Sequence, residues 1–166
     1  MTIALRGPVA PDYEAIATWI PDGKACLLWA GPRIQFPFTG QELQQRLSVA
    51  DTESFTLTDG GPVTLGFGQL GLRDGNAARL MRIIVAPPLR GLGVGRTLCR
   101  LLIAHAADVV GAQAVTLAVY RDNVAALGLY RSLGFAPEGS RSTPESLLMR
   151  LDLDRRLAKP VGQQAH

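Results

Sequence analysis

The chain lacks the features that mark several classes of protein. Its only cysteines, Cys26 and Cys99, are far apart in sequence, which excludes a four-thiolate metal site, and nothing indicates a secreted disulfide scaffold. No apolar run approaches the roughly 18 residues of a membrane span, and no charged start leads into an apolar stretch. Internal repeats and low-complexity segments are also absent. We therefore expect a cytoplasmic protein that binds neither metal nor membrane.

The composition is that of a folded domain with a small excess of positive charge. The 166 residues are 47% hydrophobic and 19% charged, which suits one domain with a single substantial core. We expect that domain to span residues 1–154, followed by a flexible tail at 155–166. The net charge of +3 suits a phosphate-bearing cofactor as well as a nucleic acid. A nucleic-acid binder needs a broader basic face, so we do not expect that function.

Periodicity and turn signals predict an irregular order of helices and strands. Asp59-Gly60-Gly61 and Asp74-Gly75-Asn76 indicate two turns that join three antiparallel strands, and Ile83-Ile84-Val85 should lie in the middle of the sheet. Residues 26–38 read as a loop. The predicted elements are an edge strand at 2–5, helices at 11–20 and 41–50, strands at 54–58, 63–72 and 78–86, a helix from 94 to about 109, a strand at 115–120, a helix at 123–133, and a strand pair at 135–138 and 147–153. This order predicts a mixed α/β fold, neither a doubly wound repeat nor a barrel.

The segment from Arg90 to Arg96, which reads RGLGVGR, places three glycines between a buried strand and a helix. The first N–H groups of a helix have no internal acceptors, and glycines let a backbone approach an anion closely. The spacing is neither that of a dinucleotide fold nor that of a nucleoside-triphosphate loop, which also needs Gly-Lys-Ser/Thr. Taken alone, the segment is equally consistent with a diphosphate site and with tight packing of a strand on a helix.

Two segments together resemble a known family. Arg90-Gly91-Leu92-Gly93-Val94-Gly95 resembles the Arg/Gln-x-x-Gly-x-Gly/Ala signature of the general N-acetyltransferase (GNAT) superfamily. Residues 80–104 resemble the central strand-loop-helix motif of that family, and residues 119–135, VYRDNVAALGLYRSLGF, resemble its second motif. The resemblance is close over residues 78–136 and looser elsewhere.

The resemblance implies a fold and an activity. The fold is a central mixed, mostly antiparallel sheet of about six or seven strands with about four flanking helices and a V-shaped splay between two parallel strands. Acetyl-CoA lies in that splay and serves as co-substrate, without a metal. The activity is transfer of the acetyl group to a primary amine of a small molecule or a protein, by direct attack through a tetrahedral intermediate. Family habit alone predicts a homodimer.

The resemblance also implies the residues of the site. Tyr130 would protonate the departing thiolate, because a phenol is protonated at neutral pH. Asn123 lies two helical turns before it, on the same side of the helix, and would contact the cofactor arm. The residues implied to bind the cofactor are Ile83, Ile84, Val85, Arg90, Gly91, Leu92, Gly93, Val94, Gly95, Arg96, Asn123 and Tyr130. The strand residues are also consistent with core packing, the two arginines with surface charges, Asn123 with a helix cap and Tyr130 with a packed aromatic.

The chain departs from the family pattern at the general base. The strand at 78–86 carries no acid, and Ala118 stands where relatives that acetylate ribosomal proteins have a Glu. We therefore name no base. For the acceptor pocket we name Trp29, Phe36 and Phe38, which are equally consistent with a hydrophobic cluster that fixes a long loop. The missing acid also permits a second function, a catalytically weak sensor domain that binds acyl-CoA.

Overall fold

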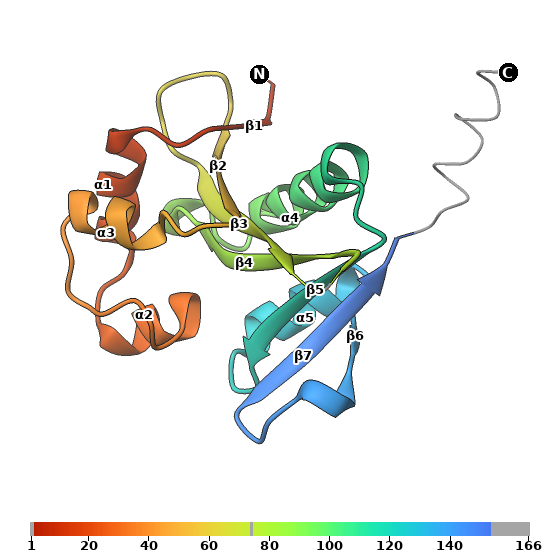
Figure 1. Cartoon of the computed structure of the whole chain (residues 1–166). Coiled ribbons are helices and arrows are strands. Elements are labelled where there is room, and N and C mark those ends of the chain that lie inside the picture. The colour runs from red at the N-terminus through yellow and green to blue at the C-terminus, as the bar shows by residue number, and fades with distance from the viewer. Residues whose placement is uncertain (1, 74, 154–166) are drawn as a thin grey trace, which may run out of the picture.

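A seven-stranded mixed sheet organises the residues that the computed structural model describes, 2–73 and 75–153 (Figure 1). The strand order is β1-β2-β3-β4-β5-β7-β6, and β4 pairs with β5 in parallel while the other neighbours are antiparallel. The strands are β1 (Ala4–Arg6), β2 (Thr52–Thr58), β3 (Gly66–Arg73), β4 (Ala77–Val85), β5 (Ala114–Tyr120), β6 (Ala136–Pro137) and β7 (Ser146–Asp152). The predicted mixed, mostly antiparallel sheet is confirmed, and β4 is its central strand.

Helices cover both faces of the sheet (Figure 1). Ile84 belongs to a hydrophobic cluster with α1, α2 and α3, whereas its neighbour Val85 belongs to a second cluster with α4. Consecutive strand residues point to opposite faces, so the two clusters lie on opposite sides of the sheet. The helices are α1 (Ala10–Trp19), α2 (Gly23–Ala30), α3 (Gly40–Leu47), α4 (Val94–His105) and α5 (Val124–Ser132), with a π-helical turn at Ala106–Val110 and 3₁₀ turns at Pro87–Leu89 and Gly139–Arg141.

The predicted loop at 26–38 is wrong in its first part, because residues 23–30 form α2. The Asp22 side chain accepts a hydrogen bond from the Ala25 N–H at 2.8 Å, which caps the start of the helix. Gly31, at φ 76°, ends it in a conformation that favours glycine. Cys26 and Ala30 are buried at helical i,i+4 spacing, a signal that the surrounding prolines and glycines obscured. The predicted tail at 155–166 lies outside the described residues.

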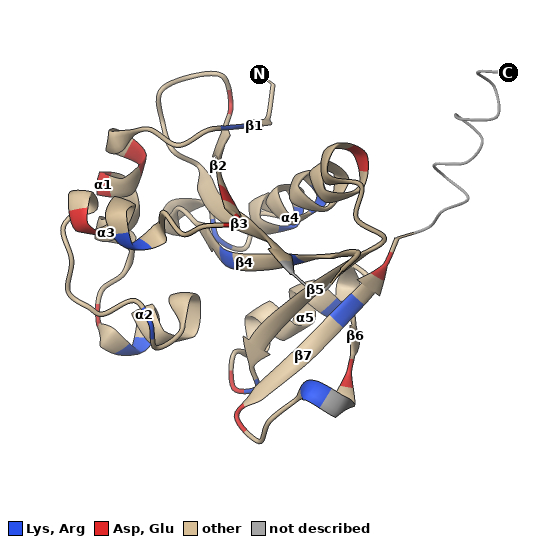
Figure 2. Ribbon diagram, viewed as in Figure 1, with Lys and Arg blue, Asp and Glu red and all other residues tan. Residues whose placement is uncertain are grey.

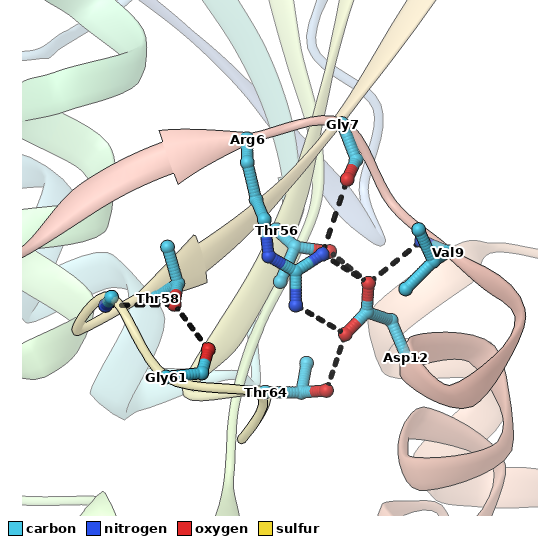
Figure 3. Close-up of polar contacts among 9 residues, drawn as sticks. Arg6, Gly7, Val9, Asp12, Thr56, Thr58, Gly61 and Thr64 are labelled. Atoms are coloured by element: carbon cyan, nitrogen blue, oxygen red, sulfur yellow. Dashed lines mark hydrogen bonds and ion pairs between the residues drawn. The ribbon is translucent and has the colours of Figure 1, made fainter.

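A network of hydrogen bonds around Asp12 fixes α1 to the edge of the sheet (Figure 3). Arg6 of β1 donates two hydrogen bonds to the Asp12 carboxylate, at 2.6 and 3.0 Å. The remaining donors are the Val9 N–H, the Thr56 hydroxyl of β2 and the Thr64 hydroxyl. Burial by itself raises the pKa of Asp12, but the hydrogen bonds outweigh burial and lower the pKa to about 2. The carboxylate therefore stays ionised in the interior.

Candidate active site

A cleft opens where β4 and β5 diverge. The two strands pair only between Ala77–Arg79 and Ala114–Thr116, although both continue for several residues. A β-bulge in β4 adds to the divergence, because the pairing with β3 shifts between Phe67 and Gln69 and Arg82 takes φ 52°. The resulting cleft has a volume of about 770 Å³ and is lined by the ends of β4 and β5, by α2 and by the start of α4 and one side of α5. The predicted splay between two parallel strands is thereby confirmed.

The glycine loop lies at one end of this cleft. Gly91 has φ 77° and Gly93 has φ 85°, in the left-handed region that favours glycine. A Cβ built on either residue would meet no heavy atom within 4 Å, so open space lies in front of the loop. Gly93 immediately precedes α4, and the N–H groups of the first turn of α4 have no acceptor within the helix. The backbone here has the geometry that an anion requires.

Arg90 and Arg96, both predicted to bind the cofactor, make side-chain hydrogen bonds next to this loop. The Arg90 Nε–H donates to the Val85 carbonyl oxygen at the end of β4, at 3.1 Å. Arg96 donates to the Ser132 hydroxyl oxygen of α5 at 2.6 Å. Both guanidinium groups lie near the loop and add positive charge there. Of the seven residues from 90 to 96, the described lining of the cleft includes Arg90, Gly91 and Gly95.

Asn123 and Tyr130 both line the cleft from α5. Asn123 is the N-cap of α5, and its side-chain oxygen accepts a hydrogen bond from the Ala126 N–H at 3.4 Å. The Tyr130 ring packs edge-to-face on Phe135, with 5.9 Å between ring centroids. Burial raises the pKa of the Tyr130 phenol above its ordinary 10.0, and the nearby Cys99 adds to the rise. Tyr130 therefore keeps its proton throughout the neutral range.

The structure separates the three aromatic residues named for the acceptor pocket. Trp29 of α2 lines the cleft together with Ile83, Ile84 and Val85 of β4. Phe36 and Phe38 instead pair edge-to-face with each other, with ring centroids 5.9 Å apart, and Phe38 packs on the cluster beneath α1–α3. This arrangement fits the alternative that they hold the loop between α2 and α3.

Sequence reasoning missed the basic residues of the cleft. Arg79 and Arg82 of β4 both line it, and Figure 2 shows the basic positions of β4 in blue. None of the Asp and Glu residues that the structure describes lines the cleft, and Ala118 is exposed in it on β5. Alternation along β4 indicates which face a side chain takes, but a bulge shifts that alternation. Because a bulge leaves no clear sequence signal, the direction of these arginines was not predictable.

Comparison with known proteins agrees with this geometry. A sequence profile of the acetyltransferase (GNAT) family matches residues 25–135, more than half of the chain. The chain belongs to the GNAT acetyltransferase family. The match begins in α2 and ends just after α5, so it includes β4, β5 and both segments that carry the resemblance.

Solved GNAT structures share the fold at low sequence identity. A spermidine N-acetyltransferase from Vibrio cholerae, in complex with CoA and spermine, has a TM-score of 0.75 and 19% identity, over 90% of this chain and 95% of that one. A PaiA N-acetyltransferase from Thermoplasma acidophilum, in complex with coenzyme A, has a TM-score of 0.68 and 19% identity, over 92% and 100% of the two chains. The ribosomal-protein-S18-alanine N-acetyltransferase from Escherichia coli has a TM-score of 0.65 and 22% identity, over 92% and 95%. These similarities establish the fold and leave the acceptor open.

The described residues lack two features that other functions need. No group of three or more His, Cys, Asp or Glu side chains within 2–73 and 75–153 is arranged to hold a metal ion. Over the same residues, no helix has both the length and the apolar character that crossing a bilayer requires.

Proposed function

We propose that this GNAT protein is an N-acetyltransferase that moves an acetyl group from acetyl-CoA to a primary amine. The observation that carries the proposal is the cleft between β4 and β5, which has a helix start at one end and Tyr130 beside it. The loop amides at residues 91–96 would bind the diphosphate of the cofactor, and the main chain of Ile83 and Val85, which line the cleft, would pair with its pantetheine arm. Acetyl-CoA supplies the activated acyl group as a thioester.

The cysteines favour direct transfer over an acyl-enzyme intermediate. Burial raises the pKa of the Cys99 thiol to about 12, and it also raises the pKa of the buried Cys26 thiol. A cysteine nucleophile must be a thiolate, and it must reach the substrate. Neither thiol meets these requirements. The amine would therefore attack the thioester carbonyl itself and form a tetrahedral intermediate.

Tyr130 is suited to the second half of this reaction. When the intermediate collapses, its C–S bond breaks, the sulfur leaves with the electron pair and takes a proton. A phenol is available to donate that proton, and the raised pKa of Tyr130 keeps the phenol protonated until the sulfur departs. The phenolate that remains would be reprotonated from water, for which burial provides a strong driving force.

Deprotonation of the amine involves no carboxylate from the described lining of the cleft. The amine would enter as its neutral form, and after attack it would release its proton to water. The rate is then expected to rise with pH until the free amine is largely neutral.

The experiment that tests this proposal is an assay of thiol release from acetyl-CoA with a panel of amines, for the wild type and Tyr130→Phe. We expect turnover by the wild type and a loss of about 100-fold in kcat for the variant. The variant should retain its affinity for coenzyme A. Tight binding of acetyl-CoA with no turnover on any amine would favour the sensor function instead. The absence of coenzyme A binding would reject both.

A further inference from the structure

One wall of the cleft is apolar and aromatic. Trp19 and Trp29, the two tryptophans of the chain, both line the cleft from the α1–α2 region. Between residues 19 and 32, all of which the structure describes, no charged residue lines the cleft. We define the tryptophan wall as the apolar lining formed by Trp19, Pro21, Ala25, Leu28, Trp29 and Pro32.

Helical spacing in α2 explains how this wall forms. Ala25, Leu28 and Trp29 are spaced i, i+3 and i+4, so they share one face of the helix. Cys26 and Ala30, on the neighbouring face, are buried in the hydrophobic cluster of α1–α3. The helix α2 therefore has two adjacent apolar faces, one that packs on the protein and one that lines the cleft.

Packing holds both tryptophans at the cleft. Each is half-buried and packs against the cluster of α1–α3, to which Ile84 of β4 also belongs. Trp19 is the last residue of α1, and Trp29 lies in the last turn of α2. A ring that is already held by packing can contact a ligand with little further loss of side-chain entropy.

The tryptophan wall is continuous with the proposed cofactor site, because Ile83 and Val85 of β4 line the same cleft. The amine must reach the thioester in this cleft, so the body of the acceptor would lie against the wall. None of the Asp and Glu residues that the structure describes lines the cleft, and Arg79 and Arg82, which do, interact with other groups of the protein. Burying an ammonium group without an anionic partner is costly, which disfavours a polycation.

We propose that the acceptor is a small amine with an aromatic body, which packs against Trp19 and Trp29. This inference rests on the proposed function and names the substrate class of the same site. Burial of an aromatic ring stabilises a complex through the apolar area that leaves water, and offset or edge-to-face contact with another ring adds to this. The acceptor would therefore differ from spermine, which is bound in the Vibrio cholerae structure.

Amines that share an aminoethyl group but differ in the attached body test this proposal. 2-Phenylethylamine carries an aromatic ring, 2-cyclohexylethylamine an aliphatic ring of similar size, and ethanolamine a hydroxyl group, while spermidine is the polycation. We expect kcat/KM for 2-phenylethylamine to exceed the values for ethanolamine and spermidine about tenfold or more. It should exceed the value for 2-cyclohexylethylamine about threefold. A preference for ethanolamine or spermidine, or equal values for the two ring-bearing amines, would overturn the proposal.

Two neighbouring leucines of α2 localise the effect. Leu28 lines the cleft, whereas Leu27 is 40% exposed and lies outside the lining. Leu28→Gln should lower kcat/KM for 2-phenylethylamine about fivefold and change the value for ethanolamine little. Leu27→Gln is the matched control and should leave both values unchanged. Equal losses in the two variants, or equal losses for the two amines in Leu28→Gln, would contradict the inference.

Replacement of one indole ring tests the aromatic contact itself. Trp29→Leu keeps an apolar side chain at the wall, so the ratio of kcat/KM for 2-phenylethylamine to that for 2-cyclohexylethylamine should fall about threefold, to near one. An unchanged ratio would show that Trp29 does not contact the ring. Coenzyme A affinity of the variant shows whether its fold is retained, and if that affinity is lost, the leucine pair decides.

A binding measurement covers the case in which none of these amines is acetylated. Because both tryptophans of the chain line the cleft, their fluorescence reports its occupancy. N-acetyl-2-phenylethylamine and N-acetylethanolamine are titrated into protein saturated with coenzyme A. A saturable change with the first compound alone, weakened by Leu28→Gln, supports the inference, and equal or absent changes with both overturn it. Saturation with coenzyme A is measured first by calorimetry. Failure of the proposed function, in which no coenzyme A binds, is thus distinguished from failure of the acceptor class.

Discussion

The two sides of the cleft are lined by different kinds of groups, main-chain amides on one side and side chains on the other. On the α4–α5 side, the groups proposed to bind the cofactor are mostly main-chain amides, and the residues that place them are glycines. On the α1–α3 side, the residues that line the cleft include Arg79, Arg82 and Trp29, which differ from the glycine loop in having long side chains. A backbone site needs a particular conformation, which only a few residue types allow. A side-chain site can be rebuilt by substitution, so it is the side where specificity can differ between members of one family.

The largest effect is expected from Tyr130, the side chain for which we propose a chemical role on the cofactor side. Tyr130→Phe should lower kcat about 100-fold, because it removes the proton donor but keeps the ring that packs on Phe135. Tyr13→Phe removes a tyrosine hydroxyl outside the cleft and should leave kcat within about twofold. Initial rates of thiol release at saturating acetyl-CoA measure both. A Tyr130→Phe enzyme with wild-type kcat would show that another group protonates the thiolate.

A change at Gly93 tests the backbone side next. Gly93→Val should weaken coenzyme A binding at least tenfold, because its branches enter the open space before the loop and its φ of 85° is strained for valine by about 1–2 kcal/mol. Gly95→Ala is the matched control. A Cβ at Gly95 would contact Leu129 and Val85 at an ordinary 3.6 Å, so the affinity should change little. Calorimetric titration with coenzyme A compares them, and equal affinities for both variants would remove the loop from the site.

Substitution of Asp12 tests whether the α1–α3 side can be destabilised without a change in coenzyme A binding on the other side. Asp12→Asn should lower the free energy of unfolding by about 3 kcal/mol, because it breaks a buried pair whose carboxylate side chain is 1% exposed. Asp152→Asn, in an exposed pair with Arg150, should change it by less than about 1 kcal/mol. Urea unfolding gives both values. Coenzyme A affinity should be nearly unchanged in Asp12→Asn, and a large loss would show that the two sides are coupled.

The lowered pKa of the Asp12 carboxylate predicts that the stability of the protein depends on pH. Its pKa is lowered from 3.8 to about 2 in the folded protein, so its stabilisation is complete above about pH 4 and is lost as the pH falls towards 2. The stability difference between wild type and Asp12→Asn should shrink over that window by about 2 kcal/mol. Urea unfolding at several pH values measures the difference. A constant difference would mean that Asp12 does not titrate as described.

The smallest effect is expected from Phe36, a residue named from sequence for the acceptor pocket. Phe36→Ala should leave kcat/KM for any acceptor within about twofold, since this half-exposed ring contacts Phe38 and not the cleft. Steady-state kinetics with the best amine of the panel measures it. A tenfold rise in KM would indicate that the loop between α2 and α3 contributes to the acceptor site.

The same comparison explains what could be predicted from the sequence. The central strand, the glycine loop and the Asn123 cap were predictable because local rules determine them: β-branched residues, positive φ and a side chain that caps its own helix. The lining of the cleft on the α1–α3 side was not predictable, because Arg79 and Arg82 reach the cleft only through strand pairing and a bulge. The placement of Phe36 and Phe38 was also not predictable, because the packing of Phe38 depends on residues of α1–α3 that are distant in sequence.

One measurement addresses the cofactor site most directly, a calorimetric titration of the wild-type protein with coenzyme A. We predict saturable one-to-one binding that Gly93→Val weakens and Gly95→Ala does not. If the wild type shows no binding heat at millimolar coenzyme A, and acetyl-CoA gives none either, the loop at the start of α4 does not bind a diphosphate and the proposed acetyl transfer has no donor.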